Sequence, residues 1–209
     1  APGSGKIIAE VPLSNALDLE EAVRTAAVAQ LKWGEQTFRD RAQVLFRMKS
    51  LIESRIDELA AVVSLENGKM LEESKASIIR GIECIEFASS LPQLSPGQVL
   101  QVSRGVECKL VRYPLGVVAG ITPFNFPFMV PLWMAPMAIG LGNAFILKPS
   151  EQTPLSAMEL ANIFKEAGLP DGLFSVVHGD REVVEALCDH PRIKALGFVG
   201  SSRVGRLVY

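Results

Sequence analysis

Apolar side chains recur every three to four positions through the first part of the chain, which is the spacing of one face of an α-helix. The pattern predicts three helices, over residues 18–33, 40–69 and 72–91. Asp18 is the predicted N-cap of the first, and Asn67–Gly68 is predicted to end the second, because glycine readily closes a helix C-terminus. The third is predicted to stop before Pro92, since proline lacks the backbone N–H that a helix interior needs.

The pattern changes in the second part of the chain, where short runs of β-branched residues alternate with helical spacing. Strands are predicted in residues 107–123, 143–150, 173–179 and 193–200. Helices are predicted in residues 154–172, 181–191 and 201–209. Repeated β-α-β units predict a parallel sheet covered on both faces, with ligands bound at the carboxyl ends of the strands.

The predicted fold class is therefore α/β, with N-terminal helices followed by a Rossmann-like parallel sheet. Residues 1–92 form a mainly helical lead-in, and residues 93–209 form an alternating strand and helix core of the nucleotide-binding type. Both segments are interpreted as parts of one nucleotide-binding domain.

The most apolar window runs from Phe124 to Ile146 and contains three closely spaced prolines. Prolines at this spacing break a membrane-spanning helix, so the window is interpreted as core. It carries one amide, Asn125, between two phenylalanines. A buried amide costs free energy unless it is hydrogen-bonded, so we expect Asn125 to be buried and to have a specific partner.

Composition narrows the possibilities further. The 209 residues are 48% hydrophobic and 21% charged, with a net charge of −2, which is typical of a globular protein and gives no indication of a nucleic-acid or membrane partner. The three cysteines are far apart and form no CxxC pair, and neither histidine has metal-ligand spacing, so no disulfide framework or metal site is expected. No signal peptide is visible, which favours a cytoplasmic location, or the mitochondrial matrix in a eukaryote.

Four motifs occur in order along the chain: "ITPFNFP", "GNAFILKPSEQTPLSA", "GLPDGLFSVVHG" and "ALGFVGSSRVG". Together they resemble the nucleotide-binding half of the aldehyde dehydrogenase superfamily, and the resemblance covers nearly the whole chain. The stretches "PFNFPFMVPLWMAPMAIGLGN", "ENGK" and "RGIECIEFA" are most similar to the methylmalonate-semialdehyde (malonate-semialdehyde) dehydrogenases. This resemblance implies NAD-dependent oxidation of a semialdehyde to acetyl-CoA or propionyl-CoA, with coenzyme A as co-substrate.

The resemblance implies a catalytic role for Asn125, whose side-chain amide would donate a hydrogen bond to the substrate oxygen as a tetrahedral adduct forms. A fixed donor in a dry pocket stabilises developing negative charge much better than water does. The alternative is a structural asparagine bonded to backbone, which is the more common role of a buried amide.

Cofactor contacts are implied for two residues of the "LKPSE" motif, Lys148 and Glu151, which would bind the adenine-side ribose hydroxyls. A carboxylate at this place favours NAD over NADP, because it repels the additional phosphate. On sequence alone, a surface lysine and glutamate around a proline turn are the more common arrangement. Gln152 replaces the arginine expected in related enzymes, which leaves its contact with the adenosine part open.

Three further residues are implied to line the cofactor. Ser201 is placed against the pyrophosphate, where a strand passes through glycine into a helix N-terminus. Thr122 and Phe124 are placed beside the nicotinamide, mainly through backbone atoms. Ordinary core packing is the alternative for Phe124.

Arg80 lies among isoleucines on a predicted helix, so we expect it to be buried and to need an anionic partner. The resemblance implies that it binds the carboxylate of a malonate-type semialdehyde. The alternative is an intramolecular ion pair with Glu83 or Glu86.

The family's reaction needs a cysteine thiolate, and none of Cys84, Cys108 and Cys188 matches its position; all three are interpreted as structural. The chain is therefore expected to be a fragment without the catalytic domain, and inactive alone. Two alternatives to an acylating enzyme remain at this point: a hydrolytic dehydrogenase of another carboxylated semialdehyde, and a non-catalytic nucleotide-binding module. Assembly into a homodimer or homotetramer is implied by the resemblance.

Overall fold

A four-stranded sheet forms the centre of the computed structural model, which describes residues 1–94 and 97–209. Its strands run in the order β5-β4-β3-β6, and every neighbouring pair is parallel. Their bounds are β3 (Val117–Ile121), β4 (Ala144–Lys148), β5 (Phe174–Val176) and β6 (Ile193–Phe198). Strands β3 and β4 are buried throughout, as expected for the middle of a parallel sheet covered on both faces, so the predicted α/β class is confirmed.

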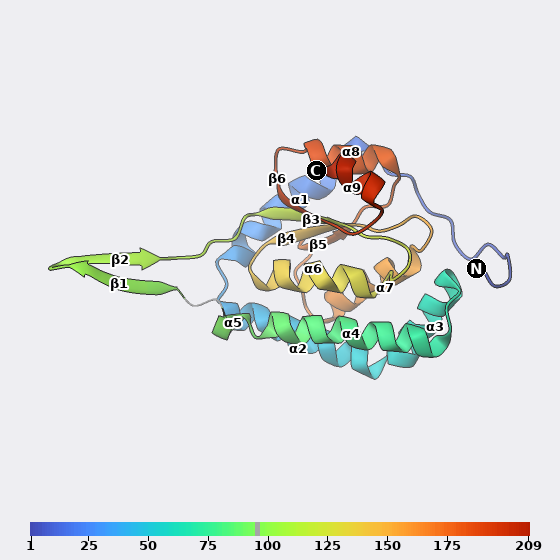
Figure 1. Cartoon of the computed structure of the whole chain (residues 1–209), viewed down its shortest axis with the longest axis horizontal. Helices are drawn as coiled ribbons and strands as arrows, with labels where there is room; N and C mark the ends of the chain where they lie inside the picture. Colours follow the sequence, from blue (N-terminus) through green and yellow to red (C-terminus); the bar gives the residue numbers. More distant parts are fainter. Residues whose placement is uncertain (95–96) are drawn as a thin grey trace.

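Helices cover the two faces of this sheet (Figure 1). One face carries α1 (Ala16–Gly34) and α8 (Arg181–Asp189). The other carries α6 (Met129–Gly140) and α7 (Leu155–Glu166), which connect β3 to β4 and β4 to β5. The chain adds β4 and β5 on one side of β3 and then places β6 on the other side of β3. The strand order therefore reverses at β3, and the connections out of β3 and β5 lie on opposite faces of the sheet.

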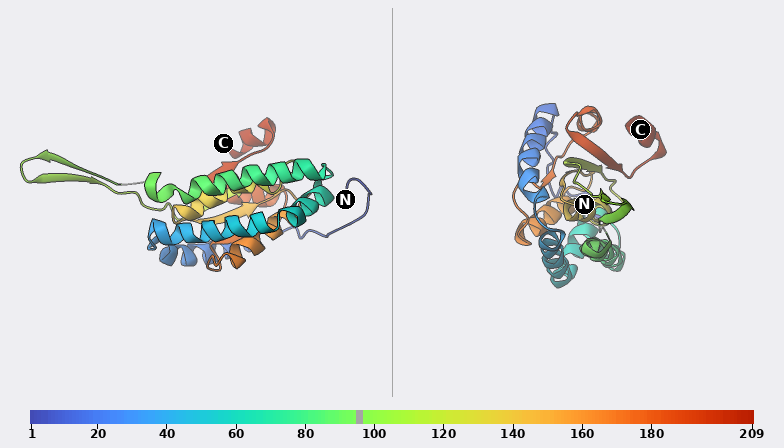
Figure 2. Two further views of the ribbon diagram at one scale, coloured as in Figure 1. Left: turned by 90° about the horizontal axis from the view of Figure 1, so that it is seen from below. Right: turned by 90° about the vertical axis from the view of Figure 1, so that its left-hand side faces the viewer.

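A further layer of helices lies outside α6 and α7 (Figure 2). It consists of α2 (Phe38–Ser54), α3 (Ile56–Asn67), α4 (Leu71–Ser89) and the short α5 (Leu91–Leu94). One continuous hydrophobic core includes residues from these helices, from α1 and from the sheet. Glycine allows α4 and α6 to pack closely: a Cβ added to Gly81 of α4 would lie 2.5 Å from Leu132 of α6.

The structure corrects two predicted helix boundaries and confirms a third. The first helix is capped by Asn15 rather than Asp18, which instead completes a capping box by accepting from the Asn15 backbone N–H at 2.9 Å. The predicted helix over 40–69 is interrupted at Arg55, where the backbone leaves the helical region with φ −119° and ψ 20°. The third predicted helix ends before Pro92, as expected: α4 ends at Ser89, and Pro92 is the second residue of the short α5, where its missing N–H costs no hydrogen bond.

The apolar window contains α6, which is twelve residues long with Pro136 inside it. Most of its side chains are buried in the core, as the sequence predicted. Among the described residues, no helix combines the length and apolar character that a membrane crossing requires.

Strand β1 (Gln98–Ser103) was not predicted, and the predicted strand over 107–123 is two separate strands. Its first part, β2 (Val106–Leu110), pairs antiparallel with β1 in a hairpin that extends away from the body (Figures 1 and 2). Every residue of both hairpin strands is exposed. The last helix is α9 (Ser202–Val208), close to its predicted position.

Candidate functional site

Polar residues gather where the parallel strands end. Thr122 follows β3, Glu151 follows β4 by three residues, and Ser201 follows β6 by three residues. Strands β3 and β6 are neighbours at the point where the strand order reverses. Doubly wound sheets bind ligands in the crevice at the carboxyl ends of such a strand pair. The topology therefore brings three of the predicted cofactor residues to one edge of the sheet.

Thr122 is 3% exposed, and its Oγ1 has no hydrogen-bond partner among the described residues. Its backbone N–H donates to the carbonyl of Lys148 at 3.1 Å, which fixes the residue beside β4. An unpaired buried hydroxyl is costly, so this oxygen is suited to a ligand that enters the crevice.

Lys148 is buried, and its Nζ lies 3.2 Å from Oε2 of the exposed Glu151. The alternative that both residues lie on the surface is therefore wrong for Lys148. Glu151 is exposed, as that alternative expects. Both residues border a cavity of about 1210 Å³, whose opposite walls come from α8 and α9. Burial and the nearby Lys148 ammonium both lower the pKa of His178, so this histidine is neutral at pH 7.

Two of the predicted cofactor residues, Gln152 and Ser201, form hydrogen bonds with residues close to them in the sequence. Gln152 is exposed, and its backbone N–H donates to the Ser150 hydroxyl at 3.3 Å. Ser201 caps α9, with its hydroxyl accepting from the Val204 N–H at 3.3 Å. Neither arrangement by itself indicates a cofactor contact.

Asn125 is exposed, which corrects the expectation that this amide is buried. The flanking Phe124 and Phe126 are also exposed, at 51% and 36%, so core packing is wrong for Phe124. The physical reason is position: the segment is a loop that leaves the end of β3 before α6 begins, and only from Pro127 onward does the chain enter the core. Within the described residues, the Asn125 side chain has no hydrogen-bond partner and remains available to a ligand.

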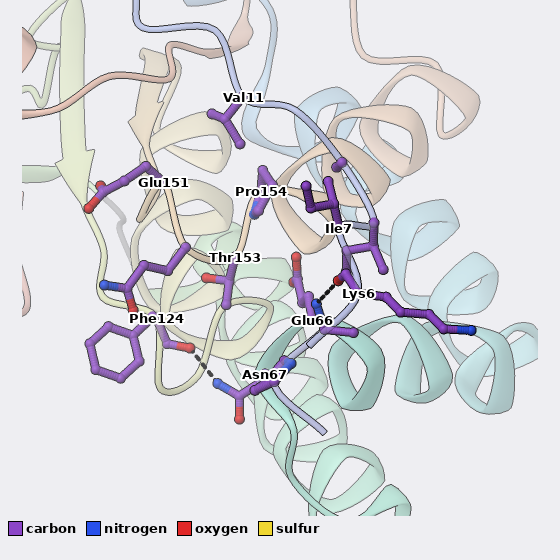
Figure 3. A pocket seen from close by; sticks show the side chains of 14 residues that line it. Lys6, Ile7, Val11, Glu66, Asn67, Phe124, Glu151, Thr153 and Pro154 are labelled. Carbon is purple, nitrogen blue, oxygen red and sulfur yellow. Dashed lines mark hydrogen bonds between the residues drawn. The ribbon is translucent and has the colours of Figure 1, made fainter. Parts of the chain in front are cut away.

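Two residues of the turn between α3 and α4 hold this loop. Asn67 donates from Nδ2 to the Phe124 carbonyl at 2.7 Å, a bond visible in Figure 3. Lys69 donates from Nζ to the Asn125 carbonyl at 2.6 Å. The sequence of this turn indicates only a helix terminus, because contacts across more than fifty residues leave no local pattern.

Arg80 is exposed on α4, so the expectation of a buried arginine is wrong. Helical geometry explains the error: the neighbouring Ile78 and Gly81 face the core, and Arg80 and Ile79 lie on the outer side. The alternative ion pairs are also not formed, since the salt bridges among residues 1–94 and 97–209 include none to Arg80, and Glu86 lies 3.4 Å from Lys49.

The three cysteines of the chain lack the features of an activated catalytic cysteine. Cys84 is partly buried, Cys108 and Cys188 are exposed, and none is in a disulfide. Burial raises the pKa of both Cys84 and Cys188, which disfavours the thiolate that a catalytic cysteine needs.

Comparison with known proteins extends over the whole chain. Residues 1–209 match the model of the aldehyde dehydrogenase family. Malonate-semialdehyde dehydrogenase 2 of Geobacillus kaustophilus (strain HTA426) and malonate-semialdehyde dehydrogenase of Bacillus pumilus (strain SAFR-032) are each 50% identical over 209 residues. The alignments cover 100% of this chain and 43% of each relative, so the chain spans less than half the length of these proteins.

Solved structures agree with the sequence relatives. A protein assigned as a methylmalonate-semialdehyde dehydrogenase from Sinorhizobium meliloti 1021, solved in complex with NAD, superposes with a TM-score of 0.97 at 42% identity, over 100% of this chain and 43% of that one. Methylmalonate-semialdehyde dehydrogenase from Oceanimonas doudoroffii gives 0.96 at 43% identity, over 98% of this chain and 42% of that one. The topology, the motifs and these likenesses agree: the chain belongs to the aldehyde dehydrogenase family.

Proposed function

We propose that this chain is the cofactor-binding part of an NAD-dependent, CoA-acylating dehydrogenase of malonate or methylmalonate semialdehyde. The observation that supports this most directly is the crevice at the carboxyl ends of β3, β4 and β6, together with the exposed Asn125 amide on the loop that follows β3. The 50% identity to malonate-semialdehyde dehydrogenases supports the substrate class.

The residues of the crevice fit NAD. The unpaired Thr122 hydroxyl can bond to the cofactor beside β3, and Ser201 lies at the start of α9. Lys148 and Glu151 offer a donor and an acceptor, which together suit the vicinal hydroxyls of a ribose. When bound, NAD supplies the hydride acceptor for aldehyde oxidation.

Asn125 has the central chemical role in this proposal. The aldehyde carbon is attacked by a cysteine thiolate that lies outside this chain, and the carbonyl oxygen becomes an alkoxide. The Asn125 amide donates a hydrogen bond to that oxygen and stabilises the negative charge. The acyl group of the thioester that remains after oxidation is transferred to the thiol of coenzyme A, and the cysteine thiol is the leaving group. The carboxylate leaves as carbon dioxide, and the electron pair of the broken C–C bond forms a thioester enolate that takes up a proton.

Lys148→Met is expected to weaken NAD binding in the complete enzyme. The change keeps the buried aliphatic stem and removes the ammonium, which costs one hydrogen bond to a charged group. Such bonds contribute about 1.5–3 kcal/mol, so the Kd for NAD is expected to rise about 10- to 100-fold in isothermal titration calorimetry. Lys165→Met, which removes an exposed lysine of α7, is the matched control. An unchanged Kd for Lys148→Met would show that Lys148 does not contact the cofactor.

The acyl acceptor distinguishes the two dehydrogenase classes. The complete enzyme is incubated with malonate semialdehyde and NAD, with and without coenzyme A, and the products are analysed by mass spectrometry. We expect acetyl-CoA and sustained NADH formation only when coenzyme A is present. A free acid formed at the full rate without coenzyme A would contradict the acylating reaction and support a hydrolytic enzyme.

We also propose that the complete protein is a homo-oligomer, a dimer or a tetramer. The β1–β2 hairpin supports this, because an isolated two-stranded ribbon is only marginally stable in water. Its apolar side chains Val99, Leu100 and Val102 are 66%, 63% and 59% exposed, which favours burial against a second copy.

A further inference from the structure

The Glu66–Lys69 turn, in which Glu66 and Asn67 end α3 and Gly68 and Lys69 begin the connection to α4, contacts both the loop after β3 and the start of α7. Figure 3 shows one of these contacts, between the Asn67 side chain and Phe124. Gly68 makes the turn possible: it adopts φ 85°, a left-handed conformation that favours glycine, and its N–H donates to the Ser64 carbonyl at 2.9 Å. This reversal brings the side chains on both sides of Gly68, Asn67 and Lys69, to the same loop.

Asn67 and Lys69 reach the loop that carries Asn125. The Asn67 amide holds the Phe124 carbonyl at 2.7 Å, and the Lys69 ammonium holds the Asn125 carbonyl at 2.6 Å. The same ammonium lies 4.0 Å from the centroid of the Phe126 ring, within the range of a cation–π interaction. Two consecutive carbonyls and the next aromatic ring are thus bound by side chains from one turn.

Glu66 anchors the turn on its other side. This carboxylate is 4% exposed and accepts from the backbone N–H groups of Leu155 and Ser156, at 2.7 and 3.0 Å, and from the Ser156 hydroxyl. It therefore caps the N-terminus of α7, where Pro154 provides no side-chain cap of its own. Burial raises the pKa of Glu66, and its three donors oppose that rise.

We infer that the Glu66–Lys69 turn is a positioning element that fixes the Asn125 amide at the rim of the cofactor crevice. Glu66 fastens the turn to the helix that follows Glu151, and Asn67 and Lys69 fasten the Asn125 loop to the turn. The inference rests on the proposed function, since it assigns these side chains a role that acts through Asn125.

An exposed loop needs such support if its side chain is to act on a reacting atom. Outside this turn, Phe124, Asn125 and Phe126 receive few constraints, because all three are exposed. A displacement of about 1 Å of a group that stabilises a transition state can lower the rate by as much as 100-fold. Loss of the Lys69 ammonium should therefore affect the chemical step and leave cofactor binding nearly unchanged.

The first test uses steady-state and binding measurements on the complete enzyme. Lys69→Met keeps the apolar stem and removes the donor, and kcat for semialdehyde oxidation is expected to fall about 10- to 100-fold, with the Kd for NAD within twofold of wild type. Lys69→Arg, which retains a cation, is expected to recover most of kcat. Lys75→Met, which removes a lysine of α4 that is paired with Asp57, is the matched control. An equal loss of kcat and NAD affinity, or an unchanged kcat, would overturn the inference.

The second test does not depend on activity. Chymotrypsin cuts after exposed aromatic residues, and the Phe124–Asn125 bond is its accessible site in the loop because Pro127 blocks cleavage after Phe126. Cleavage of this bond, followed by mass spectrometry, is expected to be about fivefold faster in Lys69→Met than in wild type, as local opening becomes more frequent. Equal rates would contradict the positioning role. If wild type oxidises no semialdehyde while the cleavage difference is present, the proposed function fails and the loop contact stands.

Discussion

Asn125→Ala is expected to lower kcat for semialdehyde oxidation about 100- to 1000-fold in the complete enzyme, equivalent to about 3–4 kcal/mol of transition-state stabilisation. The Kd for NAD should remain within twofold of wild type, because the amide meets the substrate oxygen and not the cofactor. The measurement is single-turnover NADH formation, which isolates the steps up to hydride transfer. Protein stability should hardly change, since the side chain is exposed and its amide has no partner among the described residues.

Asn162→Ala provides a matched control, because it removes an exposed amide from α7. This variant should oxidise the semialdehyde at the wild-type rate. If Asn125→Ala also retained full kcat, the amide would not stabilise the alkoxide, and the loop after β3 would lose its catalytic assignment. Asn125→Asp refines the test: it keeps the shape but replaces a donor with a negative charge, so it should be at least as impaired as the alanine variant.

The order of strands and helices was readable from the sequence because it depends on local physics. Strands β4, β5 and β6 and helices α8 and α9 were each predicted within three residues, since β-branched runs and helical spacing alternate with clear turn residues. Helix α7 begins where predicted but ends at Glu166, six residues before the predicted end. Boundaries that depend on a single backbone conformation were less accurate. The break at Arg55 has no proline or glycine to mark it, so one continuous apolar face concealed two helices.

Burial at the site was the main error, and its cause is tertiary. Asn125 stands among phenylalanines and Arg80 among isoleucines, and both were expected to be buried. Residues adjacent in sequence do not point their side chains in the same direction, because adjacent residues on a helix differ by about 100° in orientation. Gly81 contacts α6 while Arg80 points outward, a distinction that depends on the close approach of α4 and α6.

The contacts of the Glu66–Lys69 turn could not be derived from the sequence at all. Glu66 bonds to residues 89 and 90 positions later, and Lys69 bonds to a carbonyl 56 positions later. Only the fold brings these segments together. By contrast, the motif "LKPSE" could be placed correctly at the end of β4, because a buried strand followed by a polar turn is a local signal.

Arg80→Leu is expected to lower kcat/KM for malonate semialdehyde about 100-fold in the complete enzyme, while kcat/KM for propanal changes by less than twofold. The two aldehydes differ in the carboxylate, so a selective loss reports a pairing between guanidinium and carboxylate. A hydrogen-bonded charge pair removed from one side costs about 2–5 kcal/mol when it is desolvated, which accommodates a change of this size. Exposure of Arg80 in this chain is compatible with that role, since no described carboxylate occupies the guanidinium.

The control for this variant is Arg39→Leu, which removes an exposed arginine near the start of α2 and should leave both aldehydes unaffected. Arg80→Lys adds a second distinction, because a lysine keeps the charge but cannot make the bidentate contact that an arginine makes with a carboxylate. An intermediate kcat/KM of Arg80→Lys for malonate semialdehyde would indicate that the bidentate geometry of arginine contributes to binding. A value equal to wild type would indicate that the positive charge alone is sufficient. A parallel loss with propanal would instead show that Arg80 affects the reaction without binding the carboxylate, and the specificity of the enzyme for carboxylated substrates would need another cation.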